Sequence, residues 1–268
     1  MVDPVRSSGQ KELKQDGYSI YYYARGDKQK ELIVMLHPAF ADHRCFDHQA
    51  DHFAKEYRLV TVDLPGHGLS KTREKIDGAI HHIDAILKEE GTSKAHFVGV
   101  SLGALIAQYY ALHYPEKIRS LTVLGGYDIN TNNKEITQAQ RSESIRWIVK
   151  ALFSMNSFRR HVASVSVVQP AEQDRLYEMA GLFTRRSFAC MTGLGKIVKK
   201  RDAVIRNYPL LILSGDQDID LAKRIGRDWH DREPGSRFQL IENAGHCANM
   251  DNPGMFNRVV MEFIQRGV

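Results

Sequence analysis

The sequence predicts an α/β protein in which a doubly wound, mostly parallel sheet is interrupted by a helical insertion. The first observation is a series of short, continuous apolar runs separated by helical patterns. Continuous runs are typical of strands covered on both faces in a parallel sheet, because half-exposed strands alternate instead. The second observation is that the series stops across residues 128–207, where helix-like stretches appear and no buried strand is evident. Such a span is too long for a loop, so we expect a helical cap there, with residues 1–127 and 208–268 forming two parts of one core.

The core elements follow one another in the order that a wound sheet needs. Residues 15–24 alternate around an Asp16-Gly17 turn, which predicts an N-terminal β-hairpin. The last helix carries an apolar stripe that starts at Phe256 and would dock on the sheet. Strands that alternate with helices imply right-handed crossovers. The predicted buried strands are residues 32–36, 59–62, 95–100, 121–124, 210–213 and 238–241, and the helices between them include residues 45–57, 76–87 and 102–112.

Composition and charge narrow the class of protein. The chain is 43% hydrophobic and 26% charged, as in ordinary soluble globular proteins. Its net charge of +5 is uneven, since residues 128–208 hold 14 Lys and Arg against 7 Asp and Glu. These charges could be the solvated faces of helices, or they could attract an anionic substrate. No basic and aromatic stripe accompanies them, which argues against a nucleic-acid partner.

We expect a cytoplasmic protein with a small-molecule substrate and no membrane partner. The first ten residues lack an apolar segment, and no stretch approaches the roughly 18 apolar residues of a membrane span. Three scattered cysteines favour reduced thiols over a disulfide framework. The sequence yields no prediction of the oligomeric state.

The segment Gly99-Val100-Ser101-Leu102-Gly103 is the most informative feature of the chain. It lies between a predicted buried strand and a predicted helix, where G-x-S-x-G forms a nucleophile elbow that exposes the serine hydroxyl. A serine nucleophile needs a base, and the base needs an orienting carboxylate. Asp216 and Asp218 follow the predicted strand 210–213, and His246 follows the next one. All of these groups then meet at the carboxyl edge of the sheet, where open α/β sheets bind ligands.

With these motifs the chain resembles the α/β-hydrolase superfamily, in a form with a helical cap, from residue 32 to the final helix. The resemblance also includes residues 63–70 (DLPGHGLS), similar to the family's D-x-x-G-x-G-x-S loop, and residues 215–218, similar to G-x-x-D. It implies that Ser101 is the nucleophile, His246 the general base and acid, and Asp218 the carboxylate that orients the histidine. Asp216, Asp128 and Asp220 remain alternatives for the carboxylate.

The segment expected to form the oxyanion hole departs from the family pattern. The family commonly has His-Gly after the strand that corresponds to residues 32–36, whereas this chain has His37-Pro38. Proline has no N–H and cannot donate to an oxyanion. We therefore expect the amides of Ala39 and Leu102 to donate, with Phe40 as the substitute for Ala39 if the loop runs differently.

We predict no metal and no cofactor. His43, His48 and His52 fall near two aspartates, but exposed imidazoles on a helix surface explain them better than a metal site does. Cys247 is expected to be a buried spectator thiol beside His246. No phosphate-binding or cofactor motif follows a strand.

The resemblance implies a serine hydrolase that cleaves a small carboxylic ester or lactone through an acyl-enzyme. Serine rather than aspartate at the elbow argues against the epoxide-hydrolase and dehalogenase branches. Residues 37–44 and the basic cap resemble the 3-oxoadipate enol-lactonases, so an anionic substrate would contact Arg146, Arg185 and Phe40. Cleavage of a C–C bond or a thioester, and a sensor or regulator with little turnover, remain alternatives. Because His246 must be neutral, we expect activity to decline on acidification around pH 6.5.

Overall fold

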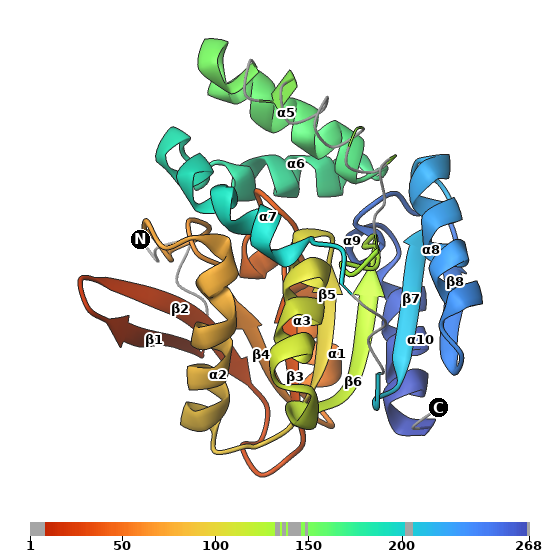
Figure 1. The fold of residues 1–268 in the computed structure, drawn as a ribbon. Helices are drawn as coiled ribbons and strands as arrows, with labels where there is room; N and C mark the ends of the chain where they lie inside the picture. Colours follow the sequence, from red (N-terminus) through yellow and green to blue (C-terminus); the bar gives the residue numbers. More distant parts are fainter. Residues whose placement is uncertain are drawn as a thin grey trace.

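A computed structural model describes residues 9–131, 135, 138, 146–147, 150–201 and 206–266. Its centre is a sheet of eight strands in the order β1-β2-β4-β3-β5-β6-β7-β8 (Figure 1). β1 pairs with β2 and β2 with β4 in antiparallel fashion, and every other pair is parallel. The predicted fold class is therefore confirmed.

The strands match the predicted apolar runs. The hairpin consists of β1 (Gln10–Gln15) and β2 (Tyr18–Arg25), which turn at Gly17. β3, β5 and β7 are buried along their whole length, as continuous apolar runs imply. The parallel strands are β3 (Leu32–Leu36), β4 (Arg58–Val62), β5 (Ala95–Val100), β6 (Ile118–Leu124), β7 (Leu210–Gly215) and β8 (Ser236–Ile241).

Helices cover both faces of the sheet and create two hydrophobic layers. One layer packs the strands against α2 (Ala79–Glu90), α3 (Leu102–His113) and α8 (Asp220–Arg232). The other packs them against α1 (Asp47–Phe53) and α10 (Pro253–Arg266). Shorter elements are η1 (His43–Phe46), η2 (Ile76–Gly78), η3 (Pro115–Lys117) and α9 (Ala248–Asp251).

Two predicted helices begin as 3-10 turns. The segment predicted as one helix over residues 45–57 consists of η1 followed by α1, which ends at Phe53. The Asp42 side chain accepts a hydrogen bond from the Arg44 amide at 3.0 Å and so starts η1 earlier than the hydrophobic pattern indicated. Similarly, η2 precedes α2.

Between β6 and β7 the described residues contain helices and no strand. We call α5 (Met155–Ser166), α6 (Pro170–Ala180), η4 (Arg185–Gly193) and α7 (Leu194–Ile197) the cap helices. They lie across the carboxyl edge of the sheet (Figure 1). Asp251 ties them to the core, since its carboxylate accepts hydrogen bonds from the amides of Val168 and Gln169 at 3.0 and 2.9 Å. The domain boundaries at residues 128 and 207 stay a prediction.

Membrane-spanning helices are not found in the part of the chain that the structure describes, because none of its helices is both long and apolar enough.

Candidate active site

Ser101 occupies a strained corner between β5 and α3. Its φ of 51° and ψ of −112° are unusual for a residue with a side chain. Its amide donates to the Leu124 carbonyl at 2.8 Å, which fastens the corner to the end of β6. A Cβ on Gly103 would overlap the Leu36 carbonyl oxygen, so only glycine lets the helix approach β3 this closely. The local geometry is that of the predicted elbow.

Asp218 is the carboxylate that contacts His246. The two side chains lie 2.8 Å apart, Asp218 Oδ2 to His246 Nδ1, and Asp218 Oδ1 accepts a hydrogen bond from the Ile219 amide at 2.8 Å. Asp218 is buried, whereas the imidazole is partly exposed. This geometry fixes the Nδ1–H tautomer when the ring is neutral, so Nε2 is the nitrogen that can accept a proton.

The three alternative aspartates serve other groups. Asp216 accepts a hydrogen bond from the Ala244 amide at 3.0 Å. Asp128 pairs with Arg206 at 2.9 Å, and Asp220 is exposed and pairs with Lys223 at 3.0 Å. The spacing that pointed to Asp218 therefore agrees with the geometry.

Asp218 and His246 each shift the pKa of the other. Burial lowers the pKa of His246, but the charge and hydrogen bond of Asp218 outweigh it, so the pKa lies above its ordinary value of 6.5. Burial would raise the pKa of Asp218, and the neighbouring imidazole together with the Ile219 amide lowers it below its ordinary range. An ionised Asp218 beside a more basic His246 is the arrangement that general-base catalysis needs.

Ser101 and His246 both lie against the end of β6, at Leu124 and Gly125. The Ser101 amide bonds to Leu124, and a Cβ on the next residue, Gly125, would lie 2.9 Å from His246 Cε1. Gly125 has a φ of 61°, which favours glycine. Gly125 was not predicted as a site residue, although a Gly-Gly pair directly after a buried strand is a signal that could have revealed it.

The backbone amides of Ala39 and Leu102 have no hydrogen-bond acceptor among the described residues, and the same holds for the next amide along the chain in each case, Phe40 and Gly103. Leu102 is the first residue of α3, and Ala39 lies in the loop after β3. His37 shapes that loop: its Nδ1–H donates to the Pro38 carbonyl at 2.7 Å, and its Nε2 accepts from the Leu64 amide at 3.0 Å. Burial lowers the pKa of His37, which keeps this neutral tautomer.

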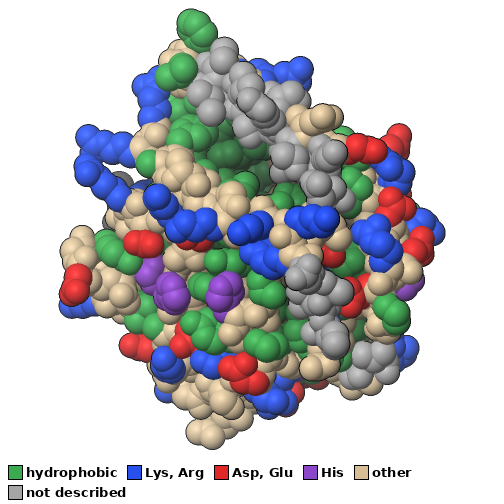
Figure 2. Space-filling model, viewed as in Figure 1, with side chains coloured by type: hydrophobic (Ala, Val, Ile, Leu, Met, Phe, Trp, Pro, Cys, Tyr) green, Lys and Arg blue, Asp and Glu red, His purple; other side chains and the backbone are tan. Residues whose placement is uncertain are grey.

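Phe40 joins the loop after β3 to the cap helices. Its φ is 69°, and its side chain is only 4% exposed. The ring packs edge-on against Trp147, Phe158 and Phe183, with centroids 5.3, 5.0 and 4.9 Å away. We call these four side chains the aromatic cluster. Figure 2 shows a hollow with hydrophobic side chains in the upper part of the molecule, at the level of the cap helices.

The other predicted substrate-binding residues are exposed arginines of the cap. Arg185 donates to the backbone carbonyls of Ala151 and Leu152, both at 3.2 Å. Arg146 precedes Trp147 of the aromatic cluster. Part of the cap's positive charge therefore holds the cap together.

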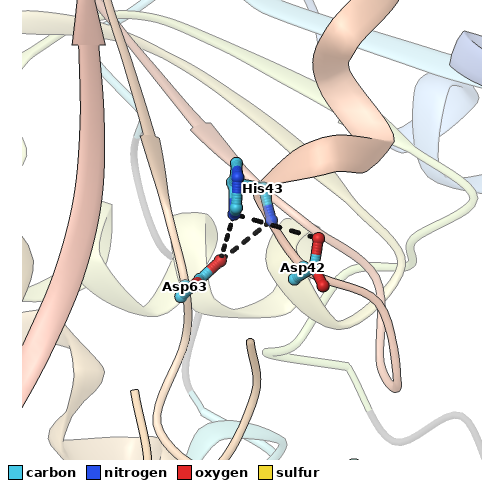
Figure 3. Close-up of side chains that lie close together, drawn as sticks. All are labelled: Asp42, His43 and Asp63. Atoms are coloured by element: carbon cyan, nitrogen blue, oxygen red, sulfur yellow. Dashed lines mark hydrogen bonds and ion pairs between the residues drawn. The ribbon is translucent and has the colours of Figure 1, made fainter. Parts of the chain in front are cut away.

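His43 was predicted to be exposed, and this is wrong. It is buried between Asp42 and Asp63, with its Nδ1 2.9 Å from Asp63 Oδ1 (Figure 3). The ring stacks on Tyr23 with centroids 3.4 Å apart. The predicted helix began at residue 45 and therefore did not position His43, whereas η1 begins at His43 and turns its side chain inward.

Three clustered ligand atoms raise the question of a metal at Asp42, His43 and Asp63. The protein already supplies donors to both carboxylates, because Asp63 accepts from the His43 and Leu69 amides and Asp42 pairs with Arg44 at 2.7 Å. A cation would have to displace them, so these residues fit a structural ion-pair cluster better than a metal site.

The sequence model of the family described as the alpha/beta hydrolase fold matches residues 31–253. The chain therefore belongs to the α/β-hydrolase family. It is 30% identical to a Homo sapiens protein named epoxide hydrolase 4, over 94% of this chain and 77% of that protein. It is 26% identical to the 2-hydroxy-6-oxononadienedioate/2-hydroxy-6-oxononatrienedioate hydrolase of Burkholderia vietnamiensis, over 88% of each.

Solved structures agree on the fold. The enol-lactonase from Burkholderia xenovorans LB400 superimposes with a TM-score of 0.78 at 18% identity, covering 95% of this chain and 100% of that chain. An esterase from Exiguobacterium antarcticum gives a TM-score of 0.80 at 19% identity, covering 97% and 100%. These likenesses show that nearly all of the chain adopts the α/β-hydrolase fold.

Proposed function

We propose that this protein is a serine hydrolase that cleaves a small carboxylic ester or lactone through an acyl-enzyme. Ser101 is the nucleophile, His246 the general base and acid, and Asp218 the orienting carboxylate. The observation that carries the proposal is the 2.8 Å contact between Asp218 and His246 beside the strained Ser101 corner. If Asp218 and His246 formed only a structural ion pair, Ser101 beside them would not have to adopt a strained backbone with a positive φ.

The reaction follows from these positions. Ser101 Oγ attacks the carbonyl carbon while His246 Nε2 takes the hydroxyl proton, and the charge of Asp218 stabilises the imidazolium. The amides of Ala39 and Leu102 donate to the tetrahedral oxyanion. The C–O bond to the leaving alcohol breaks, and His246 returns the proton to that alcohol. Water then attacks the acyl-enzyme with the same base and releases the acid and free Ser101.

An apolar group next to the scissile carbonyl is the substrate feature that the site favours. The aromatic cluster begins one residue after Ala39, so a group near the oxyanion would lie beside aromatic rings. A second candidate substrate carries a carboxylate further from the scissile carbonyl, because Arg146 and Arg185 give the cap an exposed positive charge. The names of the similar proteins include a 2-hydroxy-6-oxononadienedioate/2-hydroxy-6-oxononatrienedioate hydrolase and an enol-lactonase, and the latter agrees with lactone cleavage. The epoxide-hydrolase branch uses an aspartate as the nucleophile, and this chain has Ser101 at that position instead of a carboxylate.

Covalent labelling by a fluorophosphonate probe tests the nucleophile. We expect wild type to be labelled and to hydrolyse p-nitrophenyl esters, and Ser101→Ala to lose both, with a rate loss of about 10⁴-fold or more. Cys247→Ala is the matched control, because its thiol adjoins His246 and is buried. It should keep labelling and turnover. Loss of labelling with retained hydrolysis would contradict the proposal, and one slow turnover with a ligand-induced rise in Tm would indicate a sensor.

A paired substrate series tests the two substrate candidates. If apolar contacts dominate, kcat/KM rises with acyl length for neutral esters and changes little with salt. If the arginines bind a carboxylate, dicarboxylate monoesters are preferred, and Arg146→Gln and Arg185→Gln together with added salt remove the preference. Equal rates for both series in all variants would exclude a role for these arginines.

A further inference from the structure

Two large apolar side chains project from the cap just before α5. Leu152 is 66% exposed and Phe153 is 86% exposed. The aromatic cluster around Phe40 is largely buried, so the exposed Leu152 and Phe153 side chains are not part of it. Figure 2 shows hydrophobic side chains at the outermost point of the cap, with Lys and Arg on both sides of them. We name Leu152 and Phe153 the cap tip.

Two stretches of the cap near the cap tip are basic, whereas α6 between them carries Glu172, Asp174 and Glu178. Residues 150–169 and 181–201 together contain nine Lys and Arg and no Asp or Glu. Six of the nine are exposed, namely Arg160, Arg185, Arg186, Lys196, Lys199 and Lys200. A surface of this kind attracts a dense negative charge and is repelled by a positive one.

Arg185 is a basic residue that lies directly beside the apolar cap tip. Its guanidinium donates to the carbonyls of Ala151 and Leu152 at 3.2 Å, so a cation lies at the base of the cap tip. Thr184 and Ser187 form a capping box at the start of η4, which holds Arg185 and Arg186 in an ordered turn. The cap tip is thus a convex apolar point with fixed positive charge beside it.

We propose that the cap tip docks on an anionic lipid surface, with Leu152 and Phe153 inserted among the lipids and the neighbouring arginines on the headgroups. Lipid phosphates match the basic chain, and the acyl region accepts projecting apolar side chains that a polar partner would leave in water. An acidic protein would satisfy the charge but needs a complementary hollow for a convex apolar tip. The expectation of no membrane partner rested on the lack of a spanning segment, which peripheral docking does not require.

Vesicle co-sedimentation of the full chain tests this proposal without any turnover, so its outcome is separate from that of the proposed hydrolase. We expect binding to phosphatidylcholine vesicles that contain phosphatidylglycerol, little binding to phosphatidylcholine alone, and release by high salt. The double variant Leu152→Ser/Phe153→Ser should bind at least about tenfold more weakly, since it removes two inserting side chains. Arg160→Gln/Arg186→Gln should bind several-fold more weakly and lose part of the salt dependence.

Val165→Ser is the matched control. Val165 is 53% exposed on α5 but lies ten residues beyond its start, about 15 Å along the helix. It should bind as wild type does, and Ser101→Ala should too. Three outcomes would overturn the proposal: no binding of folded protein to anionic vesicles, wild-type binding by the Leu152→Ser/Phe153→Ser variant, or a preference for soluble polyglutamate that the double variant retains. The last result would indicate an acidic protein partner instead.

Discussion

The ring of Phe40 meets the ring of Phe183 edge-on, with centroids 4.9 Å apart. Phe40 follows Ala39 in the loop after β3, and Phe183 lies between α6 and η4 of the cap. The loop proposed to bind the oxyanion is therefore packed directly against the cap. A shift of the cap helices would move that loop as well.

Removing the Phe40 ring should weaken both stability and catalysis. Phe40→Ala leaves a cavity in the aromatic cluster and keeps a side chain at φ 69°, so we expect a loss of about 3–5 kcal/mol in the free energy of unfolding. Urea denaturation measures it. Phe40→Gly removes the same ring but relieves the left-handed backbone, and should be about 1 kcal/mol more stable than Phe40→Ala. In both variants kcat should fall more than KM rises, and an unchanged kcat would mean that the loop holds its shape without the cap.

The acid limb of activity should lie above pH 6.5. The pKa of His246 is raised by Asp218, and only the neutral imidazole accepts the Ser101 proton. As pH falls through that raised pKa, kcat/KM declines. In Asp218→Asn the charge is gone and burial lowers the pKa, so the limb should move to lower pH while the rate falls by about 10³–10⁴-fold. A pH–rate profile of both proteins checks this, and a limb that stays in place would remove Asp218 as the group that sets it.

Gly125→Ala should disturb the base without unfolding the protein. The new methyl group would lie 2.9 Å from His246 Cε1 and must displace the ring. Gly91→Ala is the control, because Gly91 also has a positive φ, 75°, but nothing lies within 4 Å of its Cβ position. Both variants should lose about 1 kcal/mol to backbone strain, and only Gly125→Ala should lose kcat. Equal kcat values would contradict the position assigned to His246.

The Asp63–His43 pair should support stability at neutral pH. Burial would raise the pKa of Asp63, but hydrogen bonds from His43 and the Leu69 amide hold it below its ordinary value of 3.8. A lowered folded-state pKa gives stability above pH 3.8 that is lost as pH falls further. Asp63→Ala removes the buried carboxylate that accepts hydrogen bonds from the His43 ring and from the His43 and Leu69 amides, so we expect a loss of about 3–5 kcal/mol at pH 7.

Asp51→Asn is the control for that experiment, since it breaks the exposed pair with Arg25 and should leave the Tm unchanged. Urea titrations at pH 7 and pH 3 compare the proteins. The difference between wild type and Asp63→Ala should shrink at pH 3, and a constant difference would show that packing rather than charge is responsible.

Much of the fold was predictable because it depends on local patterns. A continuous apolar run is typical of a doubly covered strand, and the six predicted strands all appear, although β8 at the edge of the sheet is only partly buried and not buried as predicted. The elbow at Ser101 was equally local, because the spacing of its glycines reflects the tight turn itself. The spacing after two strands pointed to Asp218 and His246, since parallel strands deliver their carboxyl ends to one edge.

Other features depend on contacts between distant segments. The inward turn of His43 depends on Asp63, twenty residues away, and the burial of Phe40 depends on cap aromatics more than a hundred residues further on. The sequence alone predicted Ser101 as the point of a nucleophile elbow, together with the strands that carry its partners. Only the tertiary structure decided which aspartate holds His246 and that Gly125 lies against it, because such choices depend on long-range packing that a local pattern does not contain.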